Sequence, residues 1–393
     1  MRASHIVIAL CFACLGLELG LWGAMVPLIS ERLSLTPLDI SLFLLLLGVS
    51  LVAAALFFPR LMRRYDSRKL VRLALPLYLG GFPLALLAPE RSVFFIAAVW
   101  VGLACGLLDG GINLQAVEWE RRARRKMLST FHGMYTLGIM GGAGYWLLLR
   151  HVGATQLQAL TPLLILVAIL MFALSGRLLD DQGDTQEATE AGSIAGSALL
   201  ELPLGLALFI GLLIFIATTV EGGMIDWSAL FLSDELDIAP ARAGVGVAVF
   251  AACMTLGRFC GDWLAHRISP IALLAWPMLL ASLLLGLAVL SRSFTLSLAA
   301  FGVLGLAVAN AFPLLLRLLA ERLNARARVG AVARVIAFAY FGVISGPVAL
   351  GLVAEHANYA ATMLGVALLA LLFALATGLF LSSFLSRTSD KSR

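Results

Sequence analysis

Twelve apolar stretches dominate this chain, and each is long enough to cross a lipid bilayer as a helix, which takes about 20 residues. The chain is 61% hydrophobic and 13% charged, whereas soluble globular proteins are roughly 45–50% apolar and about 25% charged. A water-soluble fold could not cover this much apolar surface. We therefore predict an all-α membrane protein with twelve transmembrane helices, at Ile6–Ile29, Ile40–Phe58, Leu70–Leu87, Val93–Val117, Met127–Leu149, Leu160–Leu179, Leu202–Leu232, Gly244–Leu264, Ile271–Leu290, Phe294–Leu319, Val329–Val353 and Ala361–Phe384.

The longest polar segment, from Asp180 to Ser197, divides these spans into six and six. It is acidic, rich in small residues and free of aromatic residues, which is typical of a flexible connection. We therefore predict a six-helix bundle over residues 1–179, a cytoplasmic linker over 180–198 and a second six-helix bundle over 199–393.

The two groups of spans also repeat each other. GLACGLLDGG, from Gly102, begins a span that ends in ERRARRK, and GLAVANAFP, from Gly305, begins a stretch that ends in ERLNARAR. In the following spans, a tyrosine and two glycines occur at similar positions, Tyr135, Gly138 and Gly142 in the first half and Tyr340, Gly342 and Gly346 in the second. Parallel repeats of this kind place a substrate site near the middle of the membrane, between the two bundles.

The basic residues set the predicted orientation, because cytoplasmic loops carry an excess of lysine and arginine. With twelve spans, 22 of the 28 lysines and arginines fall on the side of the two termini, five fall on the other side, and Arg258 lies within a span. We expect a multi-pass protein of a bacterial inner membrane with both termini in the cytoplasm. The run RRARRK from Arg121 then anchors the topology in the lipid bilayer, and we expect no nucleic-acid partner.

Sequence motifs of enzymes and metal sites are missing. The chain has no HExxH, GxSxG or phosphate-binding loop, and each of its five cysteines lies within an apolar span. We expect no enzymatic activity, no cofactor and no metal.

Several motifs, in order along the chain, resemble those of the major facilitator superfamily, and more narrowly its fucose-permease-like branch with the YbjJ- and MosC-type membrane proteins. They are GLLDGGINLQAVEWE, STFHGMYTLG, EGGMIDWSALFL, GRFCGDWLAHR, GLAVANAFP and AYFGVISGPVALG. The resemblance covers essentially the whole chain and implies two pseudo-symmetric bundles that transport a solute by alternating access.

One loop departs from the superfamily pattern. Between the second and third spans the superfamily usually reads G-x-x-x-D-R-x-G-R-K, and this chain reads PRLMRRYDSRK, with Arg63 in place of the aspartate. The basic residues remain but the acidic partner does not. Arg63 and Arg64, with Asp262 and Arg267 of the matching loop in the second half, are the gating candidates at this side.

Asp109 is the sharpest site candidate. It lies well within the fourth span, and Asn113 follows four residues later on the same helical face. Charged groups inside a membrane are costly and mark pathways and proton relays. In fucose permeases a carboxylate and an asparagine occupy the corresponding motif, so the resemblance implies roles in substrate binding and proton coupling. The alternative is a structural hydrogen bond to a neighbouring helix.

Other polar residues within the spans give weaker indications. Glu18 and Trp22, one turn apart in the first span, are typical of a sugar-binding wall, with packing as the alternative. Glu221 is a candidate ligand and Glu18 a second proton site, while Asp226 is a candidate for a cap or an outer gate. His132 is a candidate proton relay or a helix–helix hydrogen-bond residue, and Asn310 a candidate neutral ligand.

The leading hypothesis is secondary active transport of a small polar, sugar-like solute by a monomer, coupled to protons. The first alternative is export of an amphipathic metabolite or drug by proton antiport. The second is a membrane sensor or scaffold that does not transport.

Overall fold

The computed structural model describes residues 2–125, 127–153, 155–180, 204–320 and 325–381, and within these ranges the chain forms helices and no strand. In the first half the helices are α1 (Arg2–Leu33), α2 (Pro37–Met62), α3 (Ser67–Leu86), α4 (Arg91–Ala123), α5 (Leu128–His151) and α6 (Gln156–Leu174), followed by the short η1 (Ser175–Arg177). The second half contains α8 (Leu204–Asp234), α9 (Pro240–Ala243), α10 (Val245–Ala265), α11 (Pro270–Ser291), α12 (Phe294–Ala309), α13 (Ala311–Ala320), α14 (Ala325–His356), α15 (Tyr359–Ala376) and η3 (Thr377–Leu381).

These helices account for the twelve predicted spans. Ten segments of the described chain are long and apolar enough to cross a membrane, and α5 and α6, of 24 and 19 residues, supply the other two. The tenth span consists of α12 and α13, which are separated at Asn310. Apart from Asp180, the predicted linker 180–198 lies outside the described residues.

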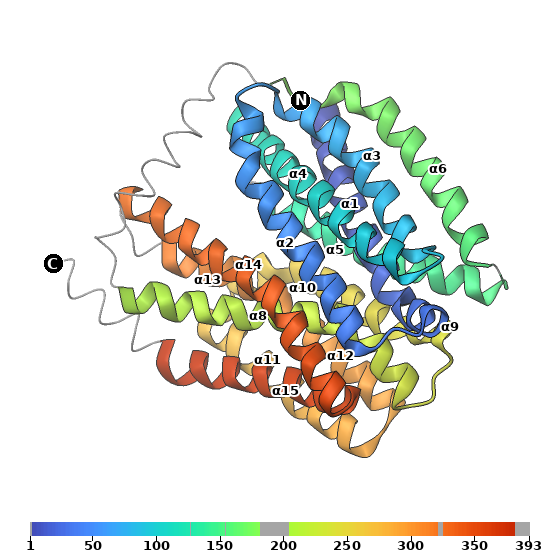
Figure 1. The fold of residues 1–393 in the computed structure, drawn as a ribbon. Coiled ribbons are helices and arrows are strands. Elements are labelled where there is room, and N and C mark those ends of the chain that lie inside the picture. The colour runs from blue at the N-terminus through green and yellow to red at the C-terminus, as the bar shows by residue number, and fades with distance from the viewer. Residues whose placement is uncertain (1, 126, 154, 181–203, 321–324, 382–393) are drawn as a thin grey trace.

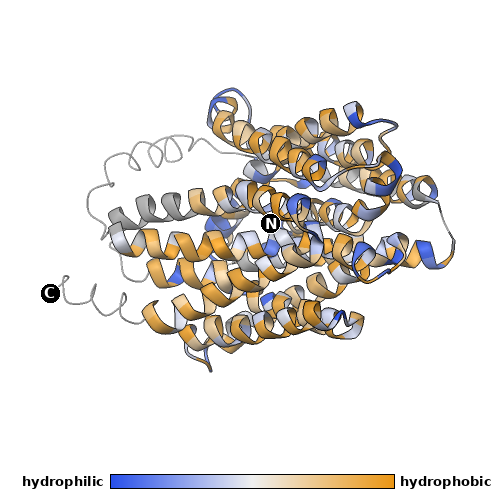
Figure 2. Ribbon diagram, turned by 60° about the horizontal axis from the view of Figure 1, so that its bottom comes forward, coloured by the Kyte–Doolittle hydropathy of each residue, from blue (hydrophilic) through white to orange (hydrophobic). Residues whose placement is uncertain are grey.

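Polar residues define the ends of the helices. Thr36 and Thr155 begin α2 and α6 with capping boxes, and Asp66 begins α3 by accepting a hydrogen bond from the backbone N–H of Lys69. Figure 2 shows hydrophobic residues along most of the helix lengths and hydrophilic residues concentrated near the loops. This distribution is the one expected of a protein whose helices span a bilayer.

The helices form two bundles. α1 packs on α5 and α4 packs on α2 and α3, whereas α10 packs on α12 and α8 packs on α14 and α15. The bundles meet where α5 contacts α10 and α2 contacts α14. In Figure 1 they converge near α9 and diverge toward the ends at which α2 ends and α8 begins. We call the face with α9 the α9 face, and the opposite one, which carries Arg63, Arg64, Arg121 and Arg122, the basic face.

Glycines allow α1 and α5 to pack with their backbones in contact. A Cβ atom placed on Gly142 would lie 2.1 Å from the carbonyl oxygen of Leu17, and one on Gly16 would lie 1.9 Å from that of Tyr135. No side chain fits in this space, so glycine is required for the close approach. Gly141, next to Gly142, has no atom within 4 Å of the position a Cβ would take.

We therefore predict that Gly142→Ala destabilises the protein while Gly141→Ala does not. Overpacking costs about 1–3 kcal/mol, whereas alanine in an open helical position is favoured by roughly 1 kcal/mol over glycine. The apparent melting temperature of the purified variants in one detergent measures the difference. Equal melting temperatures for the two variants would contradict the packing described here.

Candidate functional site

A cavity of about 330 Å³ lies between the two bundles. Its walls come from α1, α2, α3, α4 and α5 of the first bundle and from α8 and α14 of the second. Side chains with a polar group in this wall are Trp22, Tyr78, Asp109, His132, Tyr135, Thr218, Glu221, Asp226 and Tyr340. The remaining wall is largely aliphatic and aromatic, as in most ligand sites of this size.

The Asp109 carboxylate is held from both bundles. Asn113, one turn later in α4, donates its Nδ2–H to Asp109 Oδ1 at 2.9 Å. The hydroxyl of Tyr340, on α14 of the second bundle, donates to Asp109 Oδ2 at 3.5 Å. Asp109 is half-buried and lines the cavity, whereas Asn113 supports it from outside the wall. A ligand in the cavity can therefore compete with Tyr340 for one carboxylate oxygen.

A second hydrogen bond joins the bundles toward the α9 face. The indole Nε1–H of Trp22 on α1 donates to Asp226 Oδ1 on α8 at 3.0 Å. Trp22 is fully buried, its ring stacks on Phe43 with centroids 4.6 Å apart, and Asp226 is 5% exposed. This pair closes the cavity on that side. The sequence predicted that Asp226 caps its helix or pairs across an outer gate, and in the structure it pairs with Trp22 of the opposite bundle.

Glu221 forms an ion pair that the sequence did not predict. Arg258 Nη2 on α10 lies 3.7 Å from Glu221 Oε2, and the Nε of Arg258 is buried without a hydrogen-bond partner among the described residues. His132 of α5 lines the cavity beside this pair, with its ring 5.2 Å from that of Phe12. The sequence could have indicated Arg258 as a partner of a carboxylate, because it is a basic residue within a predicted span.

We also did not predict from the sequence that tyrosines line the cavity. Tyr135 and Tyr340, at similar positions in the two halves of the repeat, both line the cavity. The repeat therefore contained the information needed to find them.

Besides Asn113, two residues predicted to bind the solute do not line the cavity. The α1 residues that do are Phe12, Leu15, Leu19 and Trp22. At 3.6 residues per turn, Glu18 points roughly 80° away from the centre of this stripe. It is fully buried, and neither of its carboxylate oxygens has a hydrogen-bond partner among the described residues.

Asn310 is the second. It ends α12, and its Nδ2–H donates to the carbonyl oxygen of Gly257 at 3.1 Å. The side chain fits against α10 because residue 261 is glycine: a Cβ there would lie 2.0 Å from Asn310 Oδ1. Asn310 therefore bridges α12 and α10 away from the cavity.

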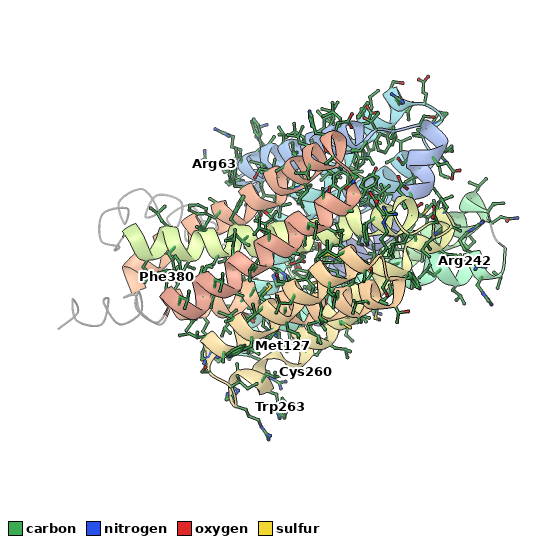
Figure 3. All side chains as sticks on the ribbon, turned by 90° about the horizontal axis from the view of Figure 1, so that it is seen from below. Arg63, Met127, Arg242, Cys260, Trp263 and Phe380 are labelled. Atoms are coloured by element: carbon green, nitrogen blue, oxygen red, sulfur yellow. The ribbon has the colours of Figure 1, made fainter. Side chains whose placement is uncertain are left out.

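The gating candidates of the basic face lie at the periphery. Arg63 and Arg64 are exposed where α2 ends, and Figure 3 shows Arg63 at the edge of the molecule. Arg267 lies over the ring of Trp263 at 4.5 Å, and the side chain of Asp262 is not among those the structure describes. The ion pairs of this loop among the described residues are instead Arg68 with Asp180 and Lys69 with Asp66.

Comparison with known proteins decides the family. Residues 208–393 match the family described as Major Facilitator Superfamily. An uncharacterised MFS-type transporter of Yersinia pestis is 30% identical over 362 residues, which are 92% of this chain and 92% of that protein. The chain belongs to the major facilitator superfamily. Membrane protein MosC of Rhizobium meliloti is 26% identical to this superfamily member over 379 residues, 95% of this chain and 89% of MosC.

Solved structures confirm the predicted twelve-helix fold of the superfamily. A bacterial homologue of the human lysosomal transporter Spinster has a TM-score of 0.71 at 15% identity and covers 99% of this chain and 97% of its own. A D-xylose–proton symporter also has a TM-score of 0.71 at 15% identity, with 96% and 98% covered. The nucleoside transporter NupG has 0.70 at 16%, with 98% and 99% covered. The superfamily consists of multi-pass membrane transporters and not of enzymes.

The bond between Trp22 and Asp226 generates a prediction. In Trp22→Phe the stacked ring remains but Asp226 loses its donor, which costs the state closed at the α9 face about 1–3 kcal/mol. Ser41, 1% exposed and in contact with Gly351 of α14, reports this opening. In a background without the native cysteines, Ser41→Cys should react faster with a water-soluble maleimide when Trp22→Phe is added.

The matched control is Trp100→Phe, because the indole of Trp100 donates to the carbonyl oxygen of Leu77 at 2.8 Å within the first bundle. That substitution should leave the labelling rate unchanged. Equal acceleration by both substitutions would show that the Trp22–Asp226 bond is no gate.

Proposed function

We propose that this protein is a proton-coupled secondary transporter, which moves a small solute across the bacterial inner membrane by alternating access. The observation that carries the proposal is the Asp109 carboxylate in the wall of a cavity between two bundles, bonded to Asn113 on one side and to Tyr340 on the other. A single group that both bundles share is well placed to link the occupancy of the cavity to the arrangement of the bundles.

The proposed coupling follows from the charge on Asp109. As a carboxylate it accepts a hydrogen bond from Tyr340, whereas as a carboxylic acid it can itself donate one. Protonation therefore changes the energy of a contact between the bundles. A ligand or proton shifts a conformational equilibrium only by the difference between its interactions in the two states, and this contact provides such a difference. A D-xylose–proton symporter with this fold makes proton coupling a natural expectation.

The proposed orientation places the basic face in the cytoplasm, together with both termini, because this face carries the clusters of arginine. The state described here is then closed to the outside. Besides the Trp22–Asp226 bond, the backbone N–H of Leu38 on α2 donates to Glu355 Oε2 on α14 at 2.9 Å. A Cβ on Gly244 would lie 2.6 Å from the Cβ of Ala24, which shows how closely the bundles meet at this face.

We further propose that residues 1–179 and 199–393 move as the two rigid bundles and that 180–198 connects them. The end of the first bundle is fixed on α4: Gln115 accepts from the N–H of Leu179 and donates to its carbonyl oxygen, each at 2.8 Å. Arg122 donates to the carbonyl oxygen of Asp180 at 2.7 Å. Because one chain forms the whole cavity, a monomer is a sufficient transport unit.

A second candidate is export of an amphipathic metabolite or drug by proton antiport. The observation that favours it is the apolar wall, in which Leu44, Leu47 and Leu51 of α2 face Val343 and Pro347 of α14. A sugar-like solute, the first expectation from the sequence, would place hydroxyl groups against this apolar side, where they find no hydrogen-bond partner. The direction of flux in vesicles with a defined proton gradient separates uptake from export.

The test of proton coupling is Asp109→Asn. A thermal-shift screen against sugars, polyols, nucleosides, organic acids and amines first supplies a solute. In proteoliposomes, the variant should accumulate that solute at least about tenfold less under a proton gradient, yet retain counterflow without one, because the amide keeps the shape of the side chain but cannot exchange a proton.

Asp237→Asn is the control, since Asp237 is exposed in the loop before α9, and its positive φ of 54° is tolerated by asparagine. It should transport as the unaltered protein does. Undiminished accumulation by Asp109→Asn would refute the assignment of proton coupling to this residue.

A further inference from the structure

We infer that the solute is an organic cation, with an ammonium group and an apolar or aromatic body; this rests on the proposed function and names its substrate class. The inference comes from the balance of charge in the cavity wall. Three side chains there carry carboxyl groups, Asp109, Glu221 and Asp226, whereas among the described lining residues none is a lysine or an arginine and His132 is the one basic side chain.

Arg258 compensates only one of these groups. It lies 3.7 Å from Glu221 and outside the wall, so this pair presents little net charge to a bound solute. Asp109 and Asp226 receive their hydrogen bonds from neutral side chains, an amide and a phenol for Asp109 and an indole for Asp226. In a site shielded from water, two carboxyl groups without a positive partner attract a cation and repel an anion.

Aromatic rings supply the second attraction. Phe12, Trp22, Tyr78, Phe82, Tyr135 and Tyr340 line the cavity, and they come from both bundles. The face of an aromatic ring attracts an ammonium group, and it also packs against an apolar body. An ammonium ion that enters this cavity thus exchanges water for carboxylate oxygens and ring faces.

The placement of the polar groups disfavours a polyhydroxylated solute. The hydrogen-bonding side chains of the wall come from α1, α3, α4, α5, α8 and α14, whereas the lining residues of α2, with Val343 and Pro347 of α14, supply only apolar surface. A sugar has hydroxyl groups around its whole ring, and those against the aliphatic wall would be buried without partners. A solute with one charged end and an apolar remainder leaves no such group unpaired.

Asp109 is the better anchor for the charged end. It is half-buried, and among the described residues its Oδ2 accepts only the long 3.5 Å contact from Tyr340. Asp226 is 5% exposed and engaged by Trp22. A cation at Asp109 Oδ2 replaces the Tyr340 contact and neutralises the carboxylate that a proton would otherwise neutralise. Cation and proton therefore compete for the Asp109 carboxylate, so we expect the protein to exchange one cation for one proton.

Three probes with the same phenylethyl body test the inference: 2-phenylethylammonium, 2-phenylethanol and 3-phenylpropanoate. Binding to the purified full-length protein is measured by saturation-transfer difference NMR with titration. The ammonium should bind at least about tenfold more tightly than the alcohol, and the carboxylate should bind more weakly than either. In Asp109→Asn the ammonium should lose this advantage over the alcohol, and in Asp237→Asn it should keep it.

Equal affinities for the ammonium and the alcohol, tighter binding of the carboxylate, or no binding of the ammonium would each overturn the inference. The comparison in the unaltered protein holds even if Asp109→Asn fails to fold. These results are independent of the counterflow experiment. Proton-driven transport of a neutral solute would refute the substrate class alone, whereas tight binding of the ammonium without flux in proteoliposomes would refute the proposed transport alone.

Discussion

Polar groups inside a bilayer have no water to bond with, so each must be bonded within the protein or face a cavity. This constraint explains the places of Thr218, Asp109 and Asp226, whereas Glu18, buried without a partner among the described residues, departs from it. Thr218 bonds to the carbonyl oxygens of Ile214 and Phe215 on its own helix, each at 3.0 Å. Asp109 and Asp226 instead find donors on the opposite bundle, Tyr340 and Trp22. The interface between the bundles is therefore both the polar centre of the molecule and the place where it can separate.

Helix contacts within a bundle differ from those between the bundles, and the difference allows the bundles to separate as units. Within the first bundle, α1 and α5 meet backbone to backbone through glycines, at positions where a Cβ atom would collide with the facing carbonyl oxygen. Between the bundles near the α9 face, individual hydrogen bonds from Trp22 and from the N–H of Leu38 add to close packing of small residues. Individual hydrogen bonds are worth about 0.5–1.5 kcal/mol net, so breaking them is possible when solute or proton supplies a comparable difference.

Local sequence signals predicted the fold because a transmembrane span depends on length and apolarity alone, and all twelve spans are present as helices. The contact between Asp109 and Asn113 could also be predicted from the sequence, because the two residues lie one helical turn apart. The contact between Trp22 and Asp226 could not, because the two residues are 204 positions apart in the sequence. Glu18 and Asn310 were misplaced for a related reason: the sequence shows that a residue is polar, but only packing decides which face of its helix meets the cavity.

Two hydrogen bonds between the bundles, one in the cavity and one at the α9 face, involve residues of α14. Tyr340, which reaches Asp109, and Glu355, which accepts from Leu38 at the α9 face, are 15 residues apart in α14, or roughly 22 Å along a straight helix. Movement that separates Tyr340 from Asp109 therefore displaces Glu355 relative to Leu38, unless α14 bends between them. Pro347 lies in that interval and removes one backbone hydrogen bond. The stiffness of α14 at this proline therefore sets how strongly the cavity and the α9 face are coupled.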